Sequence, residues 1–277
     1  MKFRRSERLV DMTNYLLENP SQLVPLTFFA DRYGSAKSSI SEDLTIIKET
    51  FERRGIGLLT TVPGAAGGVK YIVKSNEEES VQFLNEMCEI MAKPDRVLPG
   101  GYLYMNDVLG NPQLMRKVGR LIASAYADQE VNVIMTMATK GIPIANAVAS
   151  HLNVPVVIVR RDNKVTEGPT VSINYISGSS KRIQTMLLSK RSLEVGSKVL
   201  VVDDFMKAGG TIKGMTSLLE EFDATVAGIA VLIESEDTEE RLVDNYLSLL
   251  KLDEVDVKEK KINVTKGNYF DVLKKSK

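Results

Sequence analysis

The segment Val199–Thr211 reads VLVVDDFMKAGGT, and it decides the fold class of the longer part of this chain. Its first four residues are apolar without alternation, which is typical of a strand covered on both faces. Two carboxylates end this apolar run, a short turn with two glycines follows, and a helical pattern begins over Gly210–Glu221. A buried strand that leads into a helix through a short turn predicts an α/β fold.

Three more apolar runs of the same kind lie on either side of this segment. They are Val131–Met135, Val154–Val159 and Val226–Ile233. Helical patterns separate the runs, one starting at Asn111-Pro112 and one covering Ile142–Leu152. The alternation predicts a doubly wound, mostly parallel sheet with right-handed crossovers, and ligands bind such sheets at the carboxyl ends of their strands.

The first 74 residues show a different pattern, with three short helices followed by a hairpin. In the third helix, Ile40, Leu44, Ile47 and Phe51 form a buried stripe. Gly34 is expected to stop the second helix, and Ser35 to cap the third. The apolar runs Leu58–Val62 and Val69–Val73 flank a glycine-rich tip and form the hairpin. Together these elements predict a winged helix-turn-helix, whose third helix reads the major groove.

The buried stripe determines which side chains the third helix presents to DNA. The candidate DNA-binding residues are Lys37, Ser38, Ser39, Ser41 and Thr45, together with Arg4 and Arg5 ahead of the first helix. Glu42 and Asp43 are expected to repel phosphate, and the hairpin tip carries no arginine. A dimerisation or protein-binding module is therefore the alternative for this part of the chain.

Length and composition set further limits. The 277 residues suggest two domains at about 150 residues each, and we expect the boundary near Lys74, giving domains 1–74 and 75–277. The first part holds 11 basic and 8 acidic residues, and the second holds 25 and 28. This difference weakly favours an anionic partner for the first part.

One cysteine and one histidine exclude an intrachain disulfide and a two-histidine metal site, so we expect no metal site. No signal peptide or membrane span is expected, and a cytoplasmic location is the default.

The residues after the strand Val199–Val202 suit a ribose phosphate. Asp203 and Asp204 can accept hydrogen bonds from two ribose hydroxyls, and Gly209 and Gly210 let backbone N–H groups close around a phosphate. The segment resembles the phosphoribosyl pyrophosphate (PRPP) motif of type I phosphoribosyltransferases. The resemblance implies that PRPP contacts Asp203, Asp204, Phe205, Met206, Lys207, Ala208, Gly209, Gly210 and Thr211.

Further parts of the chain agree with this resemblance. The turn Ala138, Thr139, Lys140 and Gly141 lies where the family binds pyrophosphate, and Tyr102 where a hood covers the base. Arg160–Lys181 lies where the family has a mobile closing loop, although its residues also suit an ordinary long loop. Lys207-Ala208 replaces the small residue and threonine that commonly precede Gly-Gly-Thr, which puts efficient catalysis in doubt.

The winged helix and the phosphoribosyltransferase-like domain together resemble the bacterial purine operon repressors of the Gram-positive type. The resemblance implies a homodimeric, non-enzymatic repressor that binds operator DNA upstream of purine genes and is released by PRPP. It implies no required cofactor, with PRPP as effector alone or with Mg²⁺, purine nucleotides as possible competitors, and no membrane partner. The alternative is an active xanthine- or guanine-type phosphoribosyltransferase with a regulatory N-terminal domain.

Overall fold

The structure is a computed structural model that describes residues 3–64, 66–100, 102–163, 165–176, 182–236, 240–259 and 261–275. The chain divides into two compact units, whose boundary in the sequence lies between Asn76 and Glu77. The expected boundary near Lys74 falls two residues before it. Among the described residues, no helix combines the length and apolar character that a bilayer span needs.

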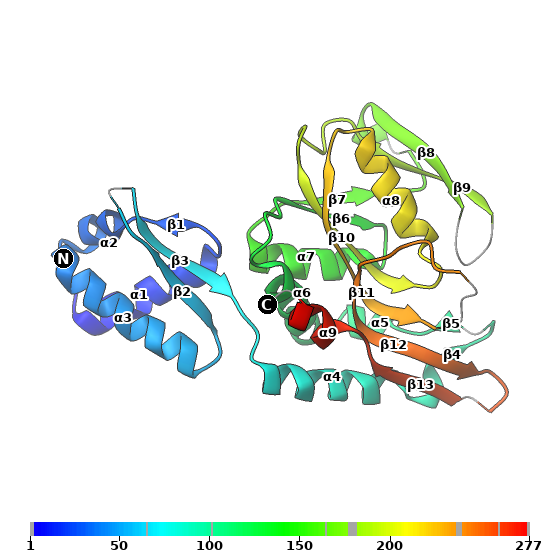
Figure 1. Ribbon diagram of the computed structural model, residues 1–277, viewed down its shortest axis with the longest axis horizontal. Coiled ribbons are helices and arrows are strands. Elements are labelled where there is room, and N and C mark those ends of the chain that lie inside the picture. The colour runs from blue at the N-terminus through cyan, green and yellow to red at the C-terminus, as the bar shows by residue number, and fades with distance from the viewer. Residues whose placement is uncertain are drawn as a thin grey trace. The chain divides into compact units, whose positions relative to one another are not determined.

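The first unit consists of three helices and a small antiparallel sheet (Figure 1). Its helices are α1 (Arg5–Glu18), α2 (Leu26–Tyr33) and α3 (Lys37–Arg53), and its strands are β1 (Leu23–Val24), β2 (Gly57–Val62) and β3 (Gly68–Val73). The strands follow the order β1-β3-β2. The predicted stripe of α3 is buried, and it packs with Met12, Leu16 and Phe29 in one core. The predicted winged helix-turn-helix is confirmed.

Two local details of this unit differ from expectation. The cap of α3 is Ala36 and not Ser35, whereas Gly34 does end α2 in the left-handed conformation, at φ 57°. The strand β1 was not predicted, because two residues are too short for a periodic pattern to show. Leu23 and Val24 become a strand only by pairing with Lys70 and Val69 of β3.

The second unit is a larger α/β structure. Its helices are α4 (Glu77–Met91), α5 (Asn106–Leu109), α6 (Pro112–Tyr126), α7 (Gly141–Leu152), α8 (Gly210–Glu220) and α9 (Tyr269–Lys275). Its central sheet contains β6 (Val133–Met137), β7 (Val156–Val159), β10 (Lys198–Met206), β11 (Thr225–Ser235), β12 (Leu247–Asp256) and β13 (Lys261–Lys266). Two small hairpins are formed by β4 (Val97–Leu98) with β5 (Tyr102–Leu103), and by β8 (Thr170–Ile176) with β9 (Ile183–Ser189).

The central sheet has the order β13-β12-β11-β10-β6-β7, and all its pairs are parallel except β12 with β13. Val199 and Val201 of β10 share a core with Met215 and Leu218 of α8. On the other face, the ring of Tyr126 from α6 covers Gly228 of β11, and its hydroxyl donates to Ile229 O at 2.7 Å. The sheet is therefore covered on both faces, as predicted (Figure 1).

The topology creates a natural crevice between β6 and β10. From β6 the chain passes through α7 to the edge strand β7, and it later returns to place β10 on the other side of β6. Such a change of winding direction opens a crevice at the carboxyl ends of the two strands. Both predicted phosphate-binding segments follow or end these two strands.

Two predicted features of this unit need correction. The strand β10 runs on to Met206, so Asp203 and Asp204 lie within it and not after it. The stretch Arg160–Lys181, expected to be a lid or a loop, contains the strand β8, which pairs along its length with β9. Lys164 and residues 177–181 of that stretch lie outside the described residues. The hairpin packs on α8, where Gly214 leaves room for Tyr175 and Met186.

Candidate ligand pocket and nucleic-acid interface

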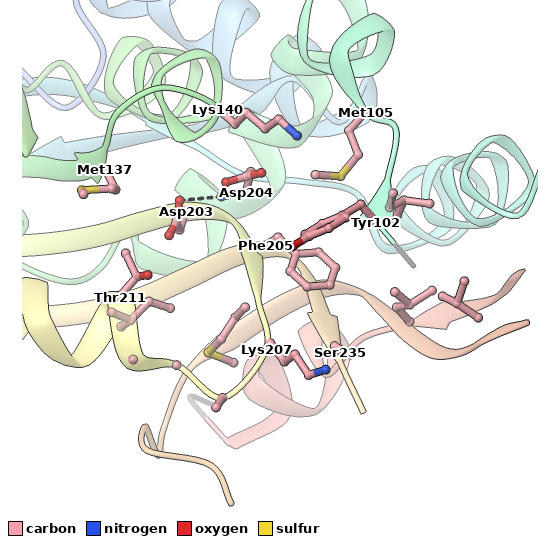
Figure 2. Close-up of a pocket in the computed structure, with 18 of the residues that line it drawn as sticks. Tyr102, Met105, Met137, Lys140, Asp203, Asp204, Phe205, Lys207, Thr211 and Ser235 are labelled. Carbon is pink, nitrogen blue, oxygen red and sulfur yellow. Dashed lines mark hydrogen bonds between the residues drawn. The ribbon is translucent and has the colours of Figure 1, made fainter. Parts of the chain in front are cut away.

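A cavity of about 1240 Å³ lies at the carboxyl ends of β6, β10, β11 and β12. It brings together the two phosphate-binding segments and the hood expected from the sequence. The expected ligand-binding residues that line it are Ala138, Thr139, Lys140, all nine residues from Asp203 to Thr211, and Tyr102. In Figure 2 the labelled side chains come from different elements, with Lys140 in the loop after β6 and Thr211 in the first turn of α8.

The two carboxylates are the electrostatic feature of the cavity. Asp203 is 6% exposed, and its Oδ1 accepts the backbone N–H of Asp204 at 3.0 Å, drawn as the dashed line in Figure 2. Burial raises the pKa of Asp203 well above its ordinary value, and the charge of Asp204 raises it further. Burial also raises the pKa of Asp204, although the charge of Lys140 opposes this shift. The pocket therefore holds two adjacent carboxylates whose ionised forms are poorly compensated by the protein.

The loop between β10 and α8 has a backbone conformation that requires glycine. Gly209 has φ 86°, and a Cβ at this position would lie 2.8 Å from Cγ2 of Val243. Any other residue would be strained there, so the loop depends on glycine. The backbone N–H of Leu242 donates to Ala208 O at 2.8 Å and holds the loop from outside. The N-terminus of α8 then presents backbone N–H groups near Thr211, which is a common arrangement for phosphate.

The loop after β6 contains the expected pyrophosphate-binding residues. The Ala138–Thr139 peptide bond is cis. Gly141 does not line the cavity itself but starts α7 close behind it. A Cβ on Gly141 would lie 2.1 Å from Oγ1 of Thr136 and 3.1 Å from Oδ1 of Asp203. Gly141 thus lets the two loops approach each other, and Lys140 stands exposed at the cavity wall.

The segment expected to form the hood is the β4–β5 hairpin, and it carries Tyr102, which lines the cavity and is 68% exposed. Buried Arg96 anchors this hairpin. Its guanidinium donates to Ile90 O at 2.7 Å, to Tyr104 O at 2.9 Å, and to both carboxylate oxygens of Asp107 at 2.7 and 2.8 Å. The Asp107 bond raises the pKa of the arginine further, so the anchor keeps its charge.

Sequence reasoning missed several residues of the pocket wall. They are Met105, Ser235, Glu236, Leu252, Asp253 and Val255. Ser235 and Glu236 could have been found, because they follow the predicted strand Val226–Ile233 at the ligand-binding edge of the sheet. Asp253 could not, since β12 was not predicted. No group of three or more possible metal-binding side chains occurs within the described ranges.

The candidate nucleic-acid interface is the outward face of α3. Lys37, Ser38, Ser41 and Thr45 are exposed there, and Ser39 is half-buried. The Thr45 hydroxyl donates to Ser41 O at 2.9 Å, so its oxygen remains available mainly as an acceptor. Four of the five candidate DNA-binding residues on α3 are therefore exposed, as expected.

The acidic and basic groups near α3 differ from the expectation. Asp43 cannot repel DNA directly, because it is fully buried and accepts hydrogen bonds from Arg5 and Arg8. Arg5 is not part of a tail ahead of α1 but its first residue. Arg4 precedes the helix, is exposed, and its backbone N–H donates to Glu7 at 2.7 Å. Glu42 is exposed, as expected.

Comparisons with known proteins agree with this architecture. The family model for the N-terminal domain of the bacterial purine repressor matches residues 4–73, and the model for the phosphoribosyl transferase domain matches residues 105–265. The adenine phosphoribosyltransferase of Rhodothermus marinus has a similar fold, with a TM-score of 0.53 and 25% identity over 62% of this chain and 99% of its own.

Two relatives are similar over nearly the whole chain. The purine biosynthesis transcriptional repressor PurR of Bacillus subtilis is 64% identical over 99% of this chain and 96% of its own length. The purine biosynthesis transcriptional activator PurR of Lactococcus lactis subsp. lactis is 52% identical over 97% and 99%. The chain, a winged helix followed by a phosphoribosyl transferase domain, therefore belongs to the family of bacterial purine biosynthesis transcriptional regulators.

Proposed function

We propose that this protein binds operator DNA upstream of purine biosynthesis genes as a repressor, and that PRPP in the pocket of the second unit relieves its binding. The observation that carries the PRPP assignment is the pair Asp203 and Asp204. Both carboxylates line the 1240 Å³ cavity, burial raises the pKa of each, and the charge of Asp204 raises that of Asp203 further, so a ligand that donates hydrogen bonds to them would stabilise their ionised forms. Neighbouring hydroxyls of a ribose are such donors.

The remaining parts of the pocket suit the other groups of PRPP. The 5′-phosphate would lie at the N-terminus of α8, where Gly209, Gly210 and Thr211 line the cavity. The pyrophosphate would lie at the loop after β6, with Lys140 as its point charge. Mg²⁺ prefers oxygen ligands, so Asp203 and Asp204 fit a magnesium ion carried by the pyrophosphate, which would neutralise part of its charge.

The first unit supplies the DNA contact. The exposed face of α3, with Ser38 and Ser41, would lie in the major groove, and Lys37 would meet phosphate. Proteins with this motif commonly bind two half-sites as dimers, and we expect a homodimer here. Because the proposed ligands are DNA and PRPP, we expect the protein in the cytoplasm.

The coupling between the two sites obeys a simple limit. PRPP can release DNA only to the extent that it binds the DNA-free state more tightly than the DNA-bound state. DNA must then weaken PRPP binding by the same factor. The relatives include a repressor and an activator, so the sign of the PRPP effect is the most informative quantity to measure.

The decisive experiment titrates Mg²⁺-PRPP into a complex of the protein with labelled purine-operon DNA, followed by fluorescence anisotropy. Release by PRPP, with a matching loss of PRPP affinity on saturating DNA, would support the proposal. DNA binding that PRPP leaves unchanged would exclude PRPP as inducer, and stronger binding would reverse the sign. Light scattering on the same samples measures the oligomeric state.

An active phosphoribosyltransferase is the second candidate, because the domain model of these enzymes matches residues 105–265. Lys207 and Ala208 argue against efficient turnover, since a hydroxyl that commonly binds phosphate is missing there. Pyrophosphate release should be measured with PRPP and xanthine, guanine, hypoxanthine or adenine. Release at rates of about 1 s⁻¹ or more, which is ordinary for enzymes, would favour the enzyme.

A further inference from the structure

The first unit contains a buried ionic cluster that ties the DNA-reading helix α3 to α1. Its centre is Asp43, whose side chain is 1% exposed. Nε of Arg5 donates to Oδ1 of Asp43 at 2.8 Å. Nε and Nη2 of Arg8 donate to Oδ2 at 2.9 and 2.8 Å. Both oxygens of one carboxylate are thus used to hold two arginines from the neighbouring helix.

The two arginines have different surroundings. The side chain of Arg8 is 13% exposed, so it mainly fills the contact between α1 and α3. The side chain of Arg5 is 53% exposed, and only its Nε is used by Asp43. Its Nη2 lies 3.7 Å from Glu42, a residue on the outward face of α3. The Arg5 guanidinium is therefore hydrogen-bonded to Asp43 through its Nε, whereas its Nη edge lies near Glu42 at the border of the outward face of α3.

We propose that Asp43 is a positioning residue for DNA binding, which holds the Nη edge of the Arg5 guanidinium against a DNA phosphate at the border of the α3 face. This inference rests on the proposed DNA-binding function and adds a role for a residue that cannot touch DNA itself. A guanidinium held at its Nε loses little rotational freedom when its Nη groups bind phosphate. An arginine on a flexible tail would lose much more.

The proposal and the simple electrostatic expectation differ in sign. If Asp43 acted only through its negative charge, Asp43→Asn would strengthen DNA binding, because one repulsion would be removed. If Asp43 positions Arg5, the same change weakens binding by about tenfold, since the charge-assisted hydrogen bond from Arg5 to phosphate is loosened or no longer forms. The slope of log Kd against log salt should then fall by about 0.9 for each phosphate that the variant no longer neutralises.

Two variants serve as matched controls. Glu42→Gln removes a negative charge from the same helix at a side chain that is 70% exposed, and it should strengthen DNA binding by about two- to fivefold. Arg8→Met weakens the buried cluster but keeps the Arg5–Asp43 bond, and it should change DNA affinity by less than about twofold. If Asp43→Asn acted only by loosening the fold, Arg8→Met would weaken DNA binding to a similar extent.

The test is a double-mutant cycle on the full chain, with operator DNA anisotropy at four salt concentrations. Arg5→Gln should weaken binding by about tenfold, and adding Asp43→Asn to it should weaken binding no further. Thermal unfolding of each variant identifies those that fail to fold. Equal or tighter DNA binding by Asp43→Asn, or additive losses in the double variant, would overturn the inference. Failure of the unaltered protein to bind operator DNA would instead refute the proposed function.

Discussion

Asp43 of the first unit and Asp203 of the second are both buried carboxylates, but their surroundings are opposite. Asp43 accepts three hydrogen bonds from two arginines, so its charge is compensated within the fold. Asp203 has another carboxylate, Asp204, as its neighbour, and its pKa is raised by burial and by that charge. A buried carboxylate that is bonded to arginines holds neighbouring helices together. A buried carboxylate next to a second carboxylate can instead be stabilised by a ligand that donates hydrogen bonds to it.

A third buried carboxylate, Glu234, shows that the second unit can also compensate a charge. Tyr246 and Ser248 each donate to it at 2.5 Å, and Nη1 of Arg241 lies 3.2 Å away. Glu234 lies on β11 next to Ser235, which lines the cavity. The crowding at Asp203 is therefore a local property of the ligand pocket and not of the sheet edge in general.

The largest expected effect is on PRPP affinity and concerns Asp203 and Asp204. Changing both Asp203 and Asp204 to Ala should weaken PRPP binding by roughly 100-fold or more, because charged hydrogen bonds contribute about 1.5–3 kcal/mol each. DNA affinity without PRPP should stay unchanged. Isothermal titration calorimetry with Mg²⁺-PRPP, paired with operator anisotropy, measures both quantities. A double variant that PRPP still releases from DNA would show that the ligand binds elsewhere.

The second prediction concerns Asp43, whose hydrogen bonds to arginine should stabilise the first unit. Asp43→Asn removes the negative charge and one of the two acceptor oxygens that Arg5 and Arg8 use, and we expect the first unit to lose about 2 kcal/mol of unfolding free energy. The loss stays below that of a fully buried pair because Arg5 is partly exposed. Urea unfolding followed by circular dichroism checks this. An unchanged midpoint would mean that the cluster adds nothing to stability.

Asp203→Asn should act in the opposite direction and stabilise the ligand-free protein by about 1 kcal/mol at neutral pH. The folded-state pKa of Asp203 is raised, so its stability contribution is full below the ordinary pKa. It is lost as the pH rises through the raised value. The free energy of unfolding, measured as the pH rises across this range, should decline for the unaltered protein and decline less for the variant. A variant with the same pH dependence would contradict the raised pKa.

The smallest effect is expected at an exposed ion pair between α1 and α2. Asp11 accepts from Nε of Arg32 at 2.7 Å and from the Tyr33 hydroxyl at 2.6 Å, and the Arg32 bond lowers its pKa. Its stabilisation is therefore present above the ordinary pKa and lost as the pH falls through the lowered value. Asp11→Asn should cost only about 0.5 kcal/mol at neutral pH, because solvent screens the pair. A cost as large as that of Asp43→Asn would remove the distinction between buried and exposed pairs.

Much of both units could be predicted from the sequence because their signals are local. The stripe Ile40–Phe51 fixed the inward face of α3, and the apolar runs located four parallel strands, although β6 begins at Val133 and not at Val131. Elements that are very short or lie near the end of the chain were not predicted. The strands β1, β4 and β5 have two residues each, and they exist only through pairing with partners elsewhere in the chain.

The sequence by itself determined that the chain carries a winged helix and a phosphate-binding α/β domain, since helical periodicity and the VLVVDDFMKAGGT segment are properties of neighbouring residues. Only the tertiary structure decided which charges are compensated. Asp43 lies 38 residues from Arg5 in the chain. Asp253 lines the pocket from β12, a strand near the C-terminal end of the second unit. Electrostatic compensation depends on distances of a few ångströms between side chains, and sequence spacing does not contain these distances.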